Sequence, residues 1–303
     1  MKQECQPTDK PATVKAHIPL VLYLIYAFVA LPYAIYPTLY AAGLFSGRVG
    51  AIIGSAFSNI LPLVLYLLFS KQRPKAVLPP ARLGLKNAAY VAVITIAGVF
   101  AIRFLAMGHF NALFGEIVPE SFDMPTFGDL FINILVFGII TATFEELWHR
   151  GPICAEYQRR GVSMWKIALL SGLLFGIVHS GLFQITYTAF FGALWAFMLY
   201  CTRSIWAPIL AHVLFNSLWN IINPIYYIRD YSVYWNILQN YVLALGIAAL
   251  VMLPIAVVCI VKLVKNNPTE KEASVNETQL FKLGYWGLIG VMFGLAVYLI
   301  IFF

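Results

Sequence analysis

Long apolar segments alternate with short polar ones along the chain, and the apolar segments are long enough to cross a membrane. A transmembrane helix needs about 20 consecutive apolar residues to span about 30 Å of hydrocarbon. The pattern therefore predicts an all-α, multi-pass membrane helix bundle of about nine transmembrane helices. Their approximate ranges are residues 18–40, 50–70, 87–108, 129–150, 166–182, 184–202, 204–223, 237–263 and 284–303.

The composition agrees with a membrane protein and excludes a water-soluble domain. Of the 303 residues, 61% are hydrophobic and 11% are charged, whereas soluble domains are about 45–50% apolar and about 25% charged. The net charge of +7 would suggest a polyanionic partner in a soluble protein. In a membrane protein a basic excess marks the cytoplasmic loops. We therefore expect membrane lipids as partners and no nucleic acid.

Lysine and arginine residues predict how the helices are oriented. With nine spans, 17 of the 20 basic residues fall on the side of the N-terminus, and the other side keeps Arg48 and Arg229. Because basic loops favour the cytoplasm, we expect a cytoplasmic N-terminus and an integral protein of the cell membrane. Arg103 lies inside the third span, and we expect its long side chain to reach the interface.

Ionisable groups interrupt three of the predicted helices. Such groups cost about 2.5 kcal/mol or more each inside a bilayer and usually mark a functional site. They are Glu145, Glu146 and Arg150 in the fourth helix, His179 in the fifth, and His212 with Asn216 in the seventh. With a rise of about 1.5 Å per residue, Glu146, His179 and His212 lie about 13 to 20 Å from the nearest cytoplasmic charge. They can therefore meet at one level of the bundle.

The spacing within each helix indicates which chemistry the residues suit. Glu146 and Arg150 are four residues apart, which predicts an ion pair along the helix. Glu145 projects about 100° away from Glu146 and is left without that partner, as suits a general base. His212 and Asn216 share one helix face, so that an imidazole and an amide could donate hydrogen bonds to one oxyanion.

Three motifs follow one another on successive helices: Glu-Glu-x-x-x-Arg at 145–150, Phe-x-x-x-His at 175–179 and His-x-x-x-Asn at 212–216. In this order they resemble the CPBP intramembrane proteases, a family that takes in CAAX prenyl endopeptidases and Abi or bacteriocin-immunity proteins. The resemblance implies a hydrolase that cleaves a peptide or protein tail presented at the membrane. It gives Glu146 and Arg150 supporting roles, and it leaves open whether the substrate is prenylated.

The same resemblance implies catalytic roles for four residues. Glu145 would be the base and, with His179, would hold the attacking water, while His212 and Asn216 would stabilise the tetrahedral oxyanion. His149 departs from the family pattern, because relatives usually carry an aromatic residue at that position. A third histidine leaves room for a different proton relay or ligand set.

The sequence leaves the cofactor open. Glu145, His179 and His212 would supply the two histidines and one carboxylate of a catalytic zinc site with a free position for water. The same side chains could activate water without a metal. The chain contains no HExxH segment, so the local ligand spacing typical of zinc proteases is absent from the sequence.

These predictions divide the chain into four parts. Residues 1–17 form a cytoplasmic tail, and residues 18–128 carry the first three membrane helices. Residues 129–223 form the catalytic membrane core with helices four to seven, and residues 224–303 carry the last two helices.

Two alternatives belong to other functional classes: a transporter, and a non-catalytic membrane protein of the scaffold or immunity type. A transporter is expected to show repeated halves with broken helices, and the sequence shows no such repeat. A non-catalytic protein would not need to keep every polar motif residue, yet all of them are present. We therefore favour the protease.

Overall fold

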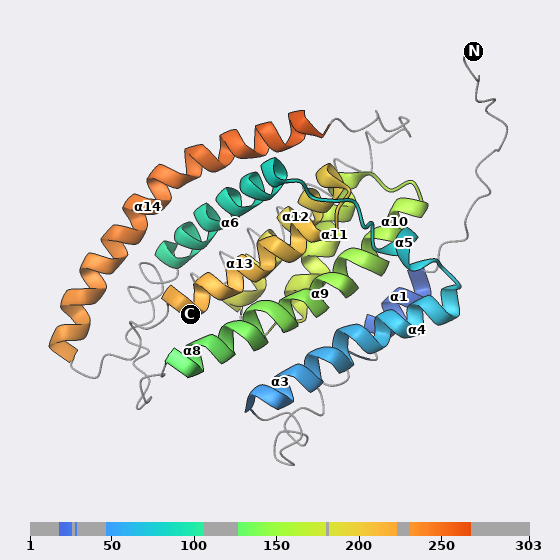
Figure 1. Ribbon diagram of the computed structural model, residues 1–303, viewed down its shortest axis with the longest axis horizontal. Coiled ribbons are helices and arrows are strands. Elements are labelled where there is room, and N and C mark those ends of the chain that lie inside the picture. Colours follow the sequence, from blue (N-terminus) through green and yellow to red (C-terminus); the bar gives the residue numbers. More distant parts are fainter. Residues whose placement is uncertain are drawn as a thin grey trace.

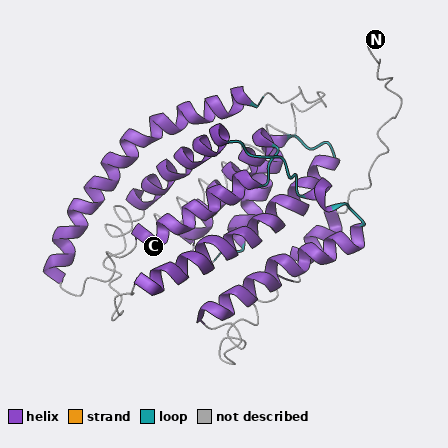
Figure 2. Ribbon diagram, viewed as in Figure 1, coloured by secondary structure: helices purple, strands orange, loops and turns teal. Residues whose placement is uncertain are grey.

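The computed structural model is a bundle of helices (Figure 1). It describes residues 18–25, 28, 47–105, 127–179, 182–222 and 231–267. Within these residues there is no strand, only one isolated bridge between Pro80 and Ser204 (Figure 2). The all-α prediction is therefore confirmed for the described chain, while the predicted tail 1–17 and the ninth span at 284–303 lie outside it.

In the described part of the chain, five helical segments are long and apolar enough to cross a membrane, which supports an integral membrane protein. These segments are Gly47–Ser70, Leu85–Leu105, Phe127–Arg159, Gln184–Thr202 and Tyr241–Asn266. A shorter apolar helix is formed by Met164–Ile177. The total of nine spans and the cytoplasmic side of the N-terminus stay predictions.

The first described helices do not all lie on the same side of the bundle: those up to residue 70 lie together, whereas the helix at residues 85–105 lies on the other side (Figure 1). They are α1 (Ile18–Ile25), the continuous run of α3 (Gly47–Ser55), η2 (Ala56–Ile60) and α4 (Leu61–Ser70), the short α5 (Pro74–Val77), and α6 (Leu85–Leu105). η2 is a π-helical turn within an otherwise α-helical span. α1 packs on α4, and η2 packs on the helix that carries the two glutamates.

The central span contains two further π-helical turns. Its elements are α8 (Phe127–Asn133), η4 (Ile134–Thr141), α9 (Ala142–Trp148), η5 (His149–Ile153) and α10 (Cys154–Arg159). Such turns inside α-helices are frequent at functional sites. The predicted end of this helix at residue 150 is wrong, because the helix continues to Arg159. Pro152 lies within η5, and Arg150 is neutralised by an ion pair, so neither residue ends the helix.

The remaining helices surround the central span. They are α11 (Met164–Ile177), α12 (Leu182–Thr202), α13 (Trp206–Ile222) and α14 (Tyr231–Asn266). α11 and α12 form a closely packed pair, and α13 packs on η4, α9 and α6. α14 lies along the outside of α6 (Figure 1). The predicted ranges agree with these helices within a few residues, except that α14 begins six residues before the predicted 237.

Polar contacts tie the spans Gly47–Ser70 and Phe127–Arg159 together at both ends. At one end Arg48 Nη2 lies 2.6 Å from Asp129 Oδ1. At the other end the Tyr66 hydroxyl donates a hydrogen bond to Glu156. The span that carries the two glutamates is thereby held against its neighbour at both ends.

Gly172 brings the backbones of α11 and α12 into contact. A Cβ atom at this position would lie 2.4 Å from the carbonyl oxygen of Ala189 and 2.7 Å from the nitrogen of Ala193. We expect Gly172→Ala to lower the free energy of unfolding by about 1–3 kcal/mol, as overpacking does. Thermal unfolding in detergent measures this loss, with Ile177→Ala at the exposed end of α11 as the control. An unchanged unfolding midpoint for Gly172→Ala would contradict the close approach.

Arg103 is buried, so the expectation that it reaches the interface is wrong. The residue exposes 1% of its surface to solvent. The guanidinium carbon lies 3.4 Å from the centroid of the Trp219 ring, and Nη2 donates a 2.8 Å hydrogen bond to the Trp219 carbonyl oxygen. Cation–π contact and a hydrogen bond to the backbone replace part of the hydration that the guanidinium loses. Arg103 thus joins α6 to α13.

Candidate active site

Glu146 on α9 forms a fully buried ion pair. Its side chain and that of Arg150 are both 0% exposed, and Arg150 Nε lies 2.9 Å from Glu146 Oε2. The guanidinium also donates a 2.9 Å hydrogen bond from Nη1 to the Ser171 hydroxyl on α11. The ion pair predicted from the spacing of these residues is confirmed, and it joins the central span to α11.

Glu145 precedes Glu146 but lies in a different environment. Its side chain is 21% exposed, and its Oε2 lies 3.7 Å from Nε2 of His212. Successive residues of a helix point about 100° apart, which explains why only Glu146 reaches Arg150. The structure therefore separates two adjacent carboxylates into a buried, paired one and a partly accessible one.

His212 on α13 is held on three sides. Its Nδ1 lies 3.0 Å from Glu146 Oε1. Because a carboxylate accepts hydrogen bonds, Nδ1 carries the proton, and Nε2 faces Glu145. Trp195 of α12 stacks on the imidazole with ring centroids 4.2 Å apart and an angle of 28° between the planes. The imidazole is thus fixed in position and in tautomer.

Asn216 lies on the same face of α13 as His212, as the spacing predicts. Its side-chain nitrogen Nδ2 lies 3.2 Å from His212 Nε2. The same nitrogen donates a 3.1 Å hydrogen bond to the carbonyl oxygen of Phe137 in η4. The amide therefore links α13 to the π-helical turn that precedes α9.

Phe175 is surrounded by three histidines. Its side chain is fully buried, and its ring meets those of His149, His179 and His212 edge to face, with centroids 5.0, 4.7 and 5.5 Å away. His179 also donates a 2.7 Å hydrogen bond from Nδ1 to the Phe175 carbonyl oxygen. The ring spaces the three imidazoles and fixes their mutual distances.

His149 is a structural neighbour of the site. The residue is 2% exposed, and its Nδ1 donates a 2.9 Å hydrogen bond to the backbone carbonyl oxygen of Glu145. Its own carbonyl oxygen accepts a 3.3 Å hydrogen bond from the Ser171 hydroxyl. The histidine that departs from the family pattern thus packs where an aromatic ring would, edge-on against Phe175.

Trp195 and Ser171 contact the site, and the sequence analysis did not single out either of them. Ser171 is a polar residue in an otherwise apolar stretch of α11, and this was a signal that could have been used. Trp195 carries no such signal, because aromatic residues are common throughout these helices. Helix α12 contributes no motif, and its part in holding His212 becomes visible only in three dimensions.

The three candidate metal ligands do not come together as a ligand set. Among the residues that the structure describes, which include Glu145, His179 and His212, no group of three or more His, Cys, Asp or Glu side chains is placed to hold a metal ion. Both histidines do hold Nδ1 against an oxygen, as metal-binding histidines usually do. The arrangement of these three side chains therefore does not fit the zinc site considered from the sequence.

Comparisons with known proteins match the part of the chain that carries these residues. Residues 127–218 match the family described as "Type II CAAX prenyl endopeptidase Rce1-like". A Bacillus subtilis (strain 168) protein named "Putative membrane peptidase YdiL" is 28% identical over 179 residues, which cover 54% of this chain and 68% of that protein. No solved structure matches the chain. The family match confirms the resemblance that the three motifs indicated.

Proposed function

We propose that this protein is an intramembrane endopeptidase that hydrolyses a peptide bond of a peptide or protein tail presented at the membrane. The family match and the peptidase name of the relative support a membrane hydrolase, and they do not favour a transporter or a non-catalytic scaffold. The observation that carries the catalytic assignment is the pair of adjacent carboxylates. Glu145 is partly accessible and lies 3.7 Å from His212, whereas Glu146 is buried and paired.

Glu145 acts as the general base and takes a proton from the attacking water. Its side chain is the accessible one of the two carboxylates, so water can reach it. His179 assists through Nε2, because Nδ1 is engaged by the Phe175 carbonyl oxygen. In the neutral imidazole Nε2 then accepts a hydrogen bond, and it holds the second proton of the water.

His212 and Asn216 stabilise the oxyanion of the tetrahedral intermediate. A His212 imidazole that carries a proton on both ring nitrogens donates from Nδ1 to Glu146 and from Nε2 to the oxyanion. Asn216 Nδ2 has two hydrogens, of which one is bound by the Phe137 carbonyl oxygen. The other is directed toward His212 Nε2, where an oxyanion placed between the two side chains would accept it. A single oxyanion donor contributes about 10²–10³-fold to kcat in other hydrolases.

In the last step the proton that Glu145 took from water is transferred to the leaving amine. Collapse of the intermediate breaks the carbon–nitrogen bond, and protonated Glu145 transfers its proton to the leaving amine. Glu146 and Arg150 take no part in proton transfer. They hold the α9 backbone and the His212 imidazole in place.

A metal chelator is expected to leave cleavage unchanged. This prediction follows from the spacing of the acidic and histidine side chains, which form no three-ligand set among the residues that the structure describes. The purified chain is reconstituted in lipid and incubated with a mixture of membrane-associated peptides, with and without chelator, and new peptide termini are identified by mass spectrometry. Loss of cleavage on chelation, with recovery on adding zinc, would contradict the metal-free mechanism.

The same experiment tests the proposed function. Products that form with the native protein and are absent with Glu145→Gln support an endopeptidase with Glu145 in its active site. The sequences of the cleaved peptides, offered with and without a prenyl group, then define the substrate class. Cleavage that is equal for both proteins would reject the assignment of the site.

A further inference from the structure

Residues 71–84, which we call the strap, connect α4 to α6 across one end of the bundle. Backbone contacts fix the strap to the turn between α12 and α13. Pro80 bridges Ser204, the backbone N–H of Ile205 donates a 2.9 Å hydrogen bond to the Pro79 carbonyl oxygen, and the Ser204 hydroxyl donates to the Ala81 carbonyl oxygen at 2.5 Å. The strap is therefore held in a defined position.

Exposed cations flank this contact. Arg82 and Lys86 come shortly after Pro80 in the sequence, and Arg203 directly precedes Ser204, the residue that Pro80 bridges. No acidic residue occurs between residues 71 and 86. The acidic residue described at this end of the bundle, Glu156, is fully buried and pairs with Arg159 at 2.5 Å. Within the described chain, these exposed cations therefore face no exposed carboxylate at this end.

One of these cations occupies a position that local energetics do not favour. Lys86 lies in the first turn of α6, where the helix dipole is unfavourable to a positive charge. Arg203 has φ = 51° and directly follows the C-terminus of α12, where the helix dipole favours a cation. Interaction with an anion outside the chain would offset the unfavourable position of the Lys86 charge.

Exposed apolar side chains lie among the cations. Leu85 is 88% exposed and Trp206 is 55% exposed. Both residues stand beside the ends of candidate spans, Leu85–Leu105 and Gln184–Thr202, which places them at the level of the lipid headgroups. Tryptophan is enriched at this level of membrane proteins. We call Arg82, Leu85, Lys86, Arg203 and Trp206 the cationic patch.

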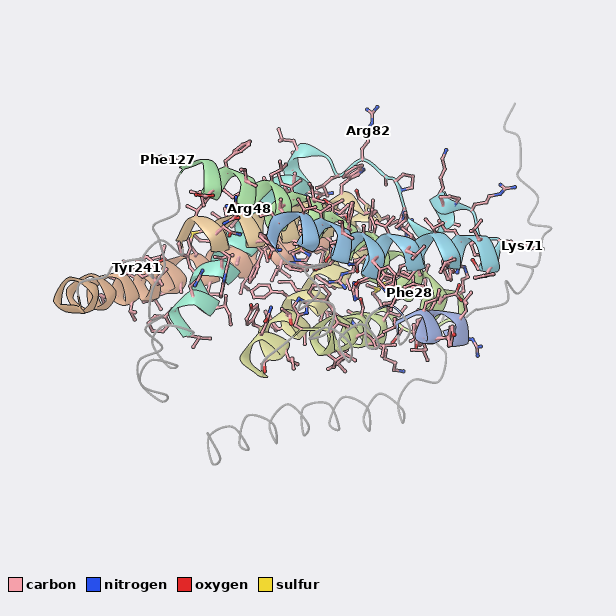
Figure 3. The ribbon with its side chains drawn as sticks, turned by 90° about the horizontal axis from the view of Figure 1, so that it is seen from below. Phe28, Arg48, Lys71, Arg82, Phe127 and Tyr241 are labelled. Carbon is pink, nitrogen blue, oxygen red and sulfur yellow. The ribbon has the colours of Figure 1, made fainter. Side chains whose placement is uncertain are left out.

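We propose that the cationic patch binds the headgroup of an anionic phospholipid. The cations supply the charge that a lipid phosphate needs, and Leu85 and Trp206 supply apolar contacts to the adjoining acyl chains. Figure 3 shows the Arg82 side chain extending from the strap away from the helices, free to meet a headgroup. We favour a lipid over an acidic protein segment because exposed apolar residues at the span ends accompany the charges.

The test compares bilayers with and without an anionic lipid. The full chain is reconstituted in nanodiscs of phosphatidylcholine alone or of phosphatidylcholine mixed with phosphatidylglycerol, and its thermal unfolding midpoint is measured. A lipid that binds the folded state raises this midpoint. The native protein should unfold at a higher temperature in the mixed bilayer. The variant with Arg82→Gln, Lys86→Gln and Arg203→Gly should lose more than half of that rise.

Glycine is chosen at position 203 because it removes the charge and suits the positive φ. The variant should therefore keep the native midpoint in pure phosphatidylcholine, which shows that it folds. The matched control replaces Lys71, Arg73 and Lys75 with glutamine. It removes the same number of charges from the other part of the strap, where Figure 3 shows Lys71 well apart from Arg82. This control should keep the higher unfolding midpoint that the native protein shows in the mixed bilayer.

Three results would overturn the proposal. The first is a native protein whose midpoint is the same in both bilayers. The second is an equal loss of the midpoint rise in the patch variant and in the control, which would indicate that any cation near the bilayer surface attracts the anionic lipid. The third is patch-dependent binding of a polyglutamate peptide in phosphatidylcholine with no effect of phosphatidylglycerol, which would assign the patch to an acidic protein partner.

Discussion

Replacing Glu145 with glutamine is expected to lower the rate of peptide cleavage by about 10²–10⁴-fold, which is the usual contribution of a positioned general base. Glutamine has nearly the same shape, but it cannot take a proton from water. Among the described residues, the Glu145 side chain makes its ion-pair contact with His212 Nε2, at 3.7 Å, and glutamine can occupy the same position. Single-turnover cleavage of a peptide that the native protein cleaves measures the effect, and the unfolding midpoint should stay unchanged.

Glu145→Asp is the matched variant for this prediction. It keeps a carboxylate but withdraws it by one methylene, so we expect its activity to lie between those of the native protein and Glu145→Gln. A Glu145→Gln protein that is folded and cleaves at the native rate would show that Glu145 is not the base. If the folded native protein cleaves none of the peptides offered to it, the non-catalytic alternative is favoured.

Replacing Arg150 with methionine is expected to destabilise the protein by about 3–5 kcal/mol, as when one partner is removed from a buried ion pair. Methionine fills much of the arginine volume, but it leaves the Glu146 carboxylate with no cation in a site where both side chains are 0% exposed. It also removes the hydrogen bond to Ser171, and with it a link between the central span and α11. Chemical unfolding in detergent measures the loss.

The double variant Glu146→Gln/Arg150→Met tests whether the loss of stability in Arg150→Met comes from the unpaired Glu146 carboxylate. It leaves no uncompensated carboxylate, so it should be more stable than Arg150→Met alone. Its cleavage rate should still be lower than that of the native protein, because His212 loses the anionic partner at Nδ1. An Arg150→Met protein that unfolds at the same denaturant concentration as the native protein would contradict a structural role for the pair.

The helices were largely predictable because the membrane imposes one simple requirement on the sequence. A spanning helix must be apolar over about 20 residues, and the ranges predicted at 50–70, 87–108 and 184–202 agree closely with the observed helices. The prediction failed where tertiary contacts compensate a polar group. The central span runs past Arg150 and Pro152 to Arg159, since the Glu146 carboxylate neutralises a charge that would otherwise mark its end.

Arg103 shows the same limit in another helix. The sequence gives its depth in the membrane but does not identify a partner, so the general behaviour of long basic side chains predicted exposure. The partner is Trp219, 116 residues away in the sequence, on α13. Contacts between residues so far apart follow from how the helices pack, which the spacing along any one helix does not encode.

The sequence by itself determined that this is a helical membrane protein, which residues are polar inside its helices, and which of them share a face. The pairs Glu146–Arg150 and His212–Asn216 follow from the periodicity of a helix alone. Only the tertiary structure decided that Glu146 binds both Arg150 and His212, that Phe175 separates three histidines, and that Trp195 supports one of them. The physical reason is that periodicity fixes directions within one helix, whereas distances between helices depend on close packing, as at Gly172.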